Sequence, residues 1–357
     1  AAVLGREFVF AVVARMTGLD EDAVLEAVEE AQAAQVVAEV RGQGAATYAF
    51  THALVRQTLA EELSLPRRQR LHLRAAAAIE QVHARDPMAH AVALAHHNRA
   101  AGVAADPAKG LAYARRAAED AMAAYAWEEA ARWWEAALEF QEMLNPDDTA
   151  TAARCDLLLA LGRALIAAGQ PRRAVDAAAT PALSLSEAQG DAARAVQACR
   201  LAIQALGQYG ASVAMGTPEY RWWAERATRH APPANADRVH ADIALGRNLR
   251  EQGRFEEARA LHVRAIATAR ALDDPEVLSS GVLALLGGFS TAPQHHAERL
   301  GLAEEFVTRL RSHASDATVV ALLFWCGIIV LDHGQRERAE AMWHEVAETV
   351  ARTRDAG

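Results

Sequence analysis

Histidine is the residue type with the widest chemical range in this sequence, because a neutral imidazole binds metal ions and titrates near physiological pH. The closely spaced members among the 14 histidines are His83, His90, His96, His97, His295 and His296. None of them follows the His-Glu-x-x-His spacing of zinc enzymes, and His344-Glu345 lacks the second histidine. Adjacent histidines on a helix also project about 100° apart. The sequence therefore predicts no metal site.

The other residue types that support catalysis are equally sparse. One of the 37 basic residues is a lysine, Lys109, and it lies outside any Gly-x-x-x-x-Gly-Lys-Ser/Thr phosphate-binding loop. Cys155, Cys199 and Cys326 are far apart and lie in predicted helices, so they indicate neither a disulfide framework nor a nucleophile. We expect a chain that is not an enzyme, binds no cofactor by itself and resides in a reducing cytoplasm.

His52 is the strongest single candidate for ligand binding. It lies where a β-rich run, residues 47–50, passes into a predicted helix over residues 52–63. The free N–H groups at the start of a helix can bind a phosphate together with an imidazole. The alternative is that His52 only packs against the preceding hairpin.

The elements around His52 form a distinct N-terminal module. Residues 8–16 and 20–34 predict two helices, and the runs 36–40 and 47–50 predict a hairpin around a glycine-bearing turn at 41–44. Pro66 then opens a further helix. This order is typical of a small winged-helix-like module, which we place at residues 1–83 and follow with a helical junction at 84–108.

Residues 109–357 repeat a helical-hairpin pattern. Ala174, Ala258 and Ala339 are each preceded by a glycine 12 residues earlier and by another 5 residues earlier. The first glycine lets two antiparallel helices approach closely, and the second adopts the left-handed conformation that ends a helix. With Ala130 and a degenerate copy at Ala297, the pattern implies about six tetratricopeptide-type hairpins, one of them irregular at 204–227. The predicted fold class is mainly α, with an α-solenoid that forms a right-handed superhelix.

Aromatic residues suggest where this solenoid binds a partner. Trp134 and Trp343 follow their repeat alanines by four residues, so we expect them in the core. The irregular copy contains the aromatic residues Tyr209, Tyr220, Trp222 and Trp223. Tyr209, Tyr220 and one of the two tryptophans could line a concave surface that binds a protein or peptide; the alternative is simple packing.

Charge argues against two classes of partner. The net charge is −9, and residues 1–80 contain 8 arginines against 11 acidic residues. The helix at 22–34, which would enter a DNA groove, carries four acidic and no basic residues, and the phosphate backbone would repel it. The longest uncharged apolar run, 319–331, is too short to span a bilayer. We expect no DNA binding and no membrane association.

Two stretches carry a recognisable pattern: residues 48–56, Tyr-Ala-Phe-Thr-His-Ala-Leu-Val-Arg, and residues 65–72, Leu-Pro-Arg-Arg-Gln-Arg-Leu-His. They resemble the winged-helix segment of bacterial STAND ATPases, whose relatives include LuxR/MalT-like regulators and ATPase-linked adenylate and guanylate cyclases. In that family a P-loop ATPase precedes the winged helix and tetratricopeptide repeats follow it. The start at 4–8 and the junction at 94–97 and 112–118 are similar as well.

The resemblance implies a role for His52. It is the counterpart of the histidine in the Met-His-Asp motif of the related NLR receptors, which contacts the β-phosphate of ADP; Thr51 and Ala53 replace the methionine and the aspartate. ATP or ADP with Mg²⁺ would then be bound by an ATPase domain outside this chain, and that domain would be an intramolecular partner. The chain starts without methionine, and we expect it to be part of a longer protein.

These observations predict the regulatory, partner-sensing region of a STAND-type signalling ATPase that controls transcription or cyclic-nucleotide signalling. One alternative is the regulatory region of a class III adenylate or guanylate cyclase. Another is a plain tetratricopeptide scaffold for protein interactions. An ATPase sequence upstream of Ala1 would distinguish the first prediction from the scaffold.

Overall fold

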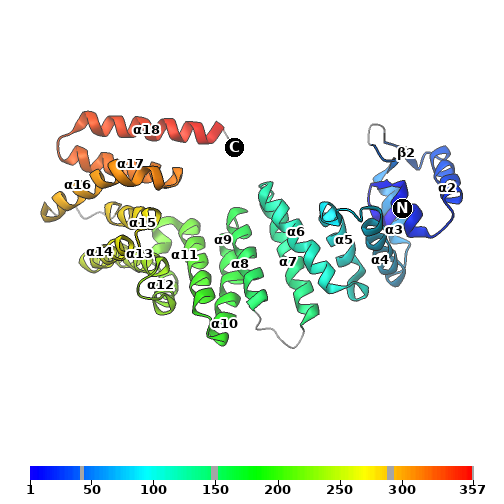
Figure 1. Ribbon diagram of the computed structural model, residues 1–357, viewed down its shortest axis with the longest axis horizontal. Helices are drawn as coiled ribbons and strands as arrows, with labels where there is room; N and C mark the ends of the chain where they lie inside the picture. The colour runs from blue at the N-terminus through cyan, green and yellow to red at the C-terminus, as the bar shows by residue number, and fades with distance from the viewer. Residues whose placement is uncertain (41–43, 146–151, 288–292, 356–357) are drawn as a thin grey trace. The chain divides into compact units, whose positions relative to one another are not determined.

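A computed structural model describes residues 1–40, 44–145, 152–287 and 293–355 (Figure 1). Helices dominate these residues, and the chain divides into two compact units, Ala1–Ala168 and Gly169–Gly357. The predicted boundaries at 83 and 108 lie inside the first unit and stay predictions. None of the helices among the described residues combines the length and the low polarity needed to cross a lipid bilayer.

The first unit begins with a small sheet and two helices. Its elements are β1 (Glu7–Val9), α1 (Phe10–Thr17), α2 (Glu21–Ala33), β2 (Val37–Glu39) and β3 (Thr47–Phe50). The strands are antiparallel in the order β1-β3-β2, and the β2–β3 register pairs Val37 with Phe50. The predicted helices and hairpin are therefore present, while residues 41–43 of the predicted turn lie outside the described residues. Strand β1 is not predicted by the sequence, because three residues are too few to show a period-2 pattern.

The remainder of the first unit is a series of helices that pack in chain order. They are α3 (Ala53–Glu61), α4 (Leu65–Val82), α5 (Ala91–Ala101), α6 (Pro107–Ala123), α7 (Trp127–Leu144) and α8 (Ala152–Ala167). Helix α4 packs on both α1 and α5, and α6 and α7 form a hairpin. The Lys109 ammonium forms an ion pair with the Glu80 carboxylate at 2.7 Å, which joins α6 to α4. The single lysine thus has a structural partner.

The described residues of the second unit form helices and the short connections between them, with no strand. The helices are α9 (Pro171–Arg173), a π-helical segment (Ala174–Ala179), α10 (Thr180–Gln189), α11 (Ala192–Met215), α12 (Pro218–His230), α13 (Ala236–Glu251), α14 (Phe255–Leu272), α15 (Pro275–Leu286), α16 (His296–Glu305), a second π-helical segment (Phe306–Leu310), α17 (Asp316–Asp332) and α18 (Arg336–Asp355). The pairs α11/α12, α13/α14 and α17/α18 form helical hairpins. The irregular copy predicted at 204–227 is therefore a hairpin as well.

The glycine pattern has the physical basis that the sequence predicts. Gly253 and Gly334 adopt left-handed φ values of 78° and 77° between the helices of their hairpins. At Gly246 and Gly327 a Cβ atom would overlap the rings of His262 and Trp343, so only glycine permits the close approach.

One predicted copy is wrong. Ala130, Ala258 and Ala339 are buried at the contact of their two helices, whereas Ala297 is exposed on α16. The hairpin in this region continues instead through the second π-helical segment, where Phe306 and Leu310 are buried. Apart from that copy, the chain is a mainly α-helical repeat protein, as predicted.

Candidate functional site

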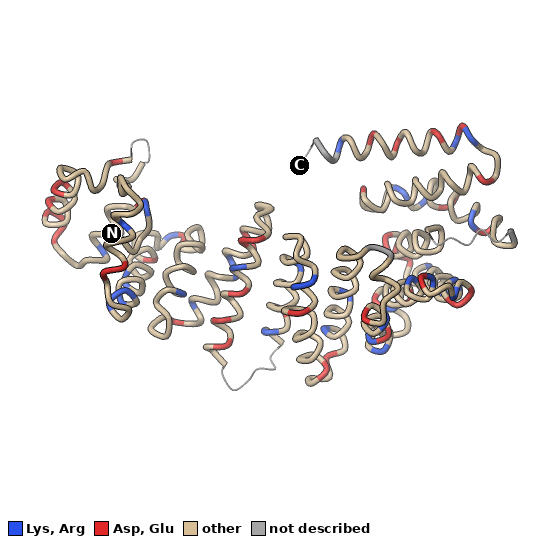
Figure 2. Tube along the Cα trace, turned by 180° about the vertical axis from the view of Figure 1, so that it is seen from behind, with Lys and Arg blue, Asp and Glu red and all other residues tan. Residues whose placement is uncertain are grey.

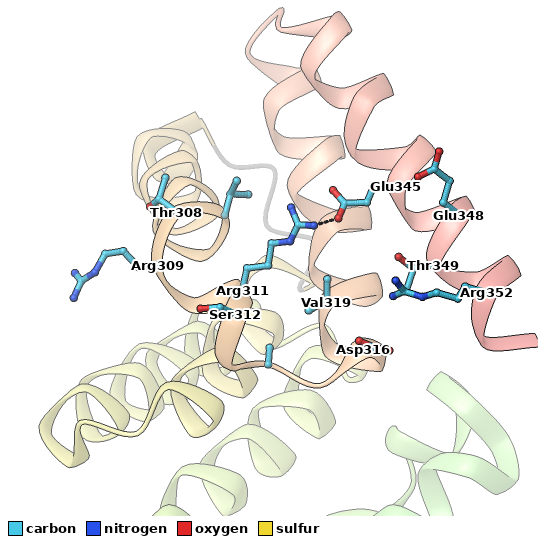
Figure 3. A pocket seen from close by; sticks show the side chains of 12 residues that line it. Thr308, Arg309, Arg311, Ser312, Asp316, Val319, Glu345, Glu348, Thr349 and Arg352 are labelled. Atoms are coloured by element: carbon cyan, nitrogen blue, oxygen red, sulfur yellow. Dashed lines mark ion pairs between the residues drawn. The ribbon is translucent and has the colours of Figure 1, made fainter. Parts of the chain in front are cut away.

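A polar groove in the second unit is the best candidate for ligand binding. It has a volume of about 710 Å³ and lies between the turn formed by residues 306–314 after α16, the start of α17 and the end of α18 (Figure 3). The buried side chains of Phe306 and Leu310 anchor the turn. This anchoring holds the polar residues of the segment 308–312 at the surface, where they line the groove.

The groove presents charges of both signs. Arg311 forms an ion pair with Glu345 of α18, and Figure 3 shows this pair at the centre of the lining residues. Further along α18, Glu348 and Arg352 line the groove, and Asp316 lines it at the start of α17. Alternating carboxylates and guanidinium groups fit a ligand with its own charged and hydrogen-bonding groups, such as an extended peptide.

The four aromatic candidates do not form one surface. Tyr220 is 1% exposed and Trp223 is 3% exposed, so both belong to the core of the second unit; the prediction of Tyr220 as a surface residue is wrong, and Trp223 is the buried member of the tryptophan pair. Trp222 and Tyr209 are exposed, at 43% and 66%. The reason is helical geometry, because Trp222 projects about 100° from Trp223 on α12.

Trp222 has a defined environment on that surface. The guanidinium of Arg226 lies 4.0 Å from the centre of its ring, and its indole meets that of Trp223 edge-to-face at 4.8 Å. The aromatic face of Trp222 is therefore already occupied by a cation from its own helix. The two tryptophans predicted for the core differ slightly: Trp134 is buried, and Trp343 is partly buried over Gly327.

His52 lies between β3 and the start of α3, as the sequence predicts, and its side chain is exposed. The neighbouring Thr51 hydroxyl donates a hydrogen bond to the Gln35 carbonyl at 2.6 Å, which fixes this end of the hairpin. Because the imidazole is exposed, it is not buried against the hairpin, as the alternative would require. Its role at a phosphate stays a prediction.

The charged residues of the N-terminal module are arranged as the sequence indicates. The acidic residues Asp22, Glu26, Glu29 and Glu30 are all exposed on α2, and Figure 2 shows the acidic positions along this helix.

On α4, the Arg74 guanidinium donates a hydrogen bond to the Thr17 carbonyl at 2.7 Å. Arg74 therefore stabilises the C-terminal end of α1.

Three histidines converge between α4 and α5. Nδ1 of His72 lies 2.8 Å from Nδ1 of His97, and one ring nitrogen from each of His72, His96 and His97 lies within 4.8 Å of the other two. The 100° between adjacent histidines does not keep the rings of His96 and His97 apart, but the prediction that they share no ion stays a prediction. Residue types alone do not indicate His72, which is 24 residues away in the sequence; the contact between two helices supplies it.

The cysteines have a different environment. All three are buried. Burial raises the pKa of the Cys199 and Cys326 thiols to about 12, so both stay protonated near neutral pH. A protonated, buried thiol is a poor nucleophile.

Comparison with known proteins supports the fold. The sequence matches no model of a known protein family and no curated protein. The apo form of RapI is similar in structure, with a TM-score of 0.50 and 9% sequence identity over 80% of this chain and 99% of that chain. At this identity the likeness shows a shared helical-repeat fold.

Two further solved structures are more distant. Aspartyl phosphate phosphatase F from Bacillus subtilis is 10% identical over 92% of this chain and 80% of that chain, with a TM-score of 0.47. A Rap protein complexed with Competence and Sporulation Factor is 12% identical over 85% of this chain and 80% of that chain, with a TM-score of 0.46.

Proposed function

We propose that this chain is a non-catalytic regulatory region whose helical repeats bind a protein or peptide. The observation that carries the proposal is the mixed-charge groove of about 710 Å³ beside α17 and α18. Stacked helical hairpins expose extended surfaces of this kind. Because the helices are already ordered, the scaffold loses little conformational entropy on binding.

The chemistry of the groove indicates the kind of ligand. Arg309 and Arg352 can bind carboxylates, while Asp316 and Glu348 can bind basic side chains or a peptide amino terminus. The residues with hydroxyl groups that line the groove are Thr308, Ser312 and Thr349. A peptide with both charge signs matches this lining better than an apolar ligand.

A charge reversal on α18 tests the proposal. A peptide display library would be selected on the purified chain, and binding of the selected peptides would be measured for Arg352→Glu and for Arg336→Glu. Both arginines lie on α18, but Arg336 lies outside the groove. We expect Arg352→Glu to weaken binding at least tenfold and Arg336→Glu to leave it unchanged. Equal effects of the two variants, or no selected peptide at all, would contradict the proposal.

We further propose that the chain belongs to a STAND-type signalling ATPase, in which residues 1–83 form a winged-helix-like module that contacts the ATPase domain. Three observations favour this context. His52 is exposed at the start of α3, and α3 has no buried residue. Leu54 on the same helix is 75% exposed, which leaves an apolar side chain available to an intramolecular partner.

Full-length protein tests this second proposal. If His52 contacts the β-phosphate of ADP, His52→Ala should speed ADP release, because a charge-assisted contact is lost. His313→Ala, an exposed histidine of the second unit, serves as the control. Unchanged ADP release in His52→Ala would end this role, and the absence of an ATPase sequence upstream of Ala1 would favour the plain scaffold. A cyclase domain at either end would favour the cyclase-regulating alternative.

A further inference from the structure

The contact between α4 and α5 contains three histidines whose ring nitrogens face one another. His72 comes from α4, and His96 and His97 come from α5. His72 and His97 are buried and their Nδ1 atoms are 2.8 Å apart, while His96 is exposed. One nitrogen from each ring lies within 4.8 Å of the other two. Ring nitrogens this close together are typical of a set of metal ligands rather than of three independent side chains.

We propose that His72, His96 and His97 form a zinc-binding site in which the exposed side of the ion, next to His96, is completed by water. Zinc bound by three histidines and a water is a common tetrahedral arrangement. The ion would join α4 to α5 within the first unit.

Burial keeps the two inner rings unprotonated. Burial, followed by repulsion from its histidine neighbours, lowers the pKa of His97 to about 3, and burial lowers the pKa of His72 to about 4. Both rings are therefore neutral at pH 7, which is the form that binds a metal.

The short contact requires one proton to move. Two neutral rings that share an Nδ1–Nδ1 hydrogen bond carry one proton between those atoms, so one Nδ1 donates and the other accepts. When zinc binds at both Nδ1 atoms, this proton moves to Nε2 of its own ring, and both rings stay neutral. The step needs no other reactant.

The distances are compatible with the ion after small side-chain movements. Zinc–nitrogen bonds of about 2.0–2.1 Å in a tetrahedron place the ligand atoms roughly 3.3 Å apart. The 2.8 Å pair must widen slightly, and the more distant nitrogen must approach from at most 4.8 Å. Since His96 is at the surface, its side chain has room to rotate toward the buried pair.

The nearby charges and the ligand atoms together bear on which ion this site binds. The positive charges of Arg68 and Arg99 lie near His72 and His96 and oppose any cation. The Arg99 charge is partly offset, because its guanidinium forms a bidentate ion pair with Glu139 at 2.6 and 2.8 Å. A purely imidazole ligand set favours zinc and its transition-metal neighbours over magnesium and calcium, which prefer oxygen ligands.

Metal titration of the untagged, EDTA-treated chain tests the proposal. We expect one equivalent of Zn²⁺ in calorimetry, and a visible absorption band when Co²⁺ replaces it, as is typical of tetrahedral cobalt. His96→Ala should weaken Zn²⁺ binding at least tenfold and remove the band, because it deletes one ligand at the surface without disturbing the buried pair. His52→Ala removes another exposed histidine of the same unit and should change neither.

Several outcomes would overturn the site. The absence of stoichiometric Zn²⁺ binding would show that His72 and His97 form only a structural hydrogen bond. Binding that survives in His96→Ala, or that is lost equally in His52→Ala, would assign the metal to other residues. A circular-dichroism melt of each variant establishes that it is folded before its affinity is compared.

Discussion

The helix pairs α4/α5 and α13/α14 both bury polar side chains, but they satisfy them in opposite ways. In α13/α14 the Asp242 carboxylate is fully buried and is bound by Arg264 at 2.6 and 2.7 Å and by Arg238 at 3.1 Å. In α4/α5 the buried titratable side chains are His72 and His97, whose pKa values are lowered by burial and which contact each other.

This difference separates a cluster that only stabilises the fold from one that can bind a metal ion. The negative charge of Asp242 is neutralised by two guanidinium groups of its own unit. The carboxylate therefore already has cationic partners and does not need a metal ion to balance its charge. The rings between α4 and α5 supply lone pairs, and no carboxylate is part of the histidine trio. Burial alone therefore does not mark a site; the balance of charge within the cluster does.

The largest expected effect is the loss of the buried carboxylate. Asp242→Ala should lower the free energy of unfolding by about 1.5 to 3 kcal/mol, because it removes the buried carboxylate that Arg238 and Arg264 share, while the half-exposed Arg264 stays solvated. Urea unfolding followed by circular dichroism measures this change. The matched control is Asp120→Ala, which breaks the exposed pair with Arg116 and should cost less than about 1 kcal/mol. Similar losses in both variants would mean that the buried network is no stronger than a surface pair.

Acid should weaken α13/α14 through His262. Burial lowers the pKa of His262 to about 4; a backbone hydrogen bond to Ile243 and the charge of Asp242 oppose this shift, and the charges of Arg247 and Arg250 assist it. The unfolded chain takes up the proton near pH 6.5, so stability is lost as the pH falls from about 6.5 to about 4. At pH 5 the loss should be about 2 kcal/mol, since one pKa unit corresponds to about 1.4 kcal/mol.

The variant His262→Leu isolates this contribution. Unfolding free energies of both proteins would be measured at pH 7.5 and pH 5. The other histidines act equally in the two proteins, so the wild type should lose about 2 kcal/mol more than the variant. Parallel pH profiles would show that His262 titrates normally in the folded state.

A smaller effect is expected at the close approach of α13 and α14. Gly246→Ala should destabilise the protein by about 1 to 2 kcal/mol, because the new methyl group overlaps the His262 ring and outweighs the better helix propensity of alanine. Gly301→Ala on α16 is the control, since no atom lies near its added methyl group. That variant should gain up to about 1 kcal/mol; a gain in both variants would show that the ring moves aside freely. Thermal melts of the two variants give the comparison.

The smallest effect concerns the turn between α6 and α7. Tyr125 has a φ of 60°, five residues before Ala130, where the other hairpins place glycine. Tyr125→Gly should raise the free energy of unfolding by about 0.5 to 1 kcal/mol, because glycine adopts this conformation without steric cost. The reciprocal change, Gly253→Ala, should lower it by about 1 kcal/mol. Chemical denaturation of both variants checks the opposite signs, and equal signs would contradict this explanation of the turn.

The amino-acid sequence by itself determined the local architecture. The glycine and alanine spacing predicts the α13/α14 and α17/α18 hairpins, and Gly18 and Pro66 predict the end of α1 and the start of α4. These predictions succeed because helix ends and helix periodicity depend on residues within one or two turns of each other. The same local reasoning misplaced a repeat at Ala297, which is exposed on α16.

Only the tertiary structure decided which side chains meet. The sequence cannot distinguish Trp222 from Trp223, although one is exposed and the other is buried, because their environment depends on where α11 and α13 lie around α12. It also could not bring His72 to His96 and His97, since that contact depends on the packing of α4 against α5. Side chains distant in the sequence converge through helix packing, and this packing is set by the whole buried surface rather than by any single motif.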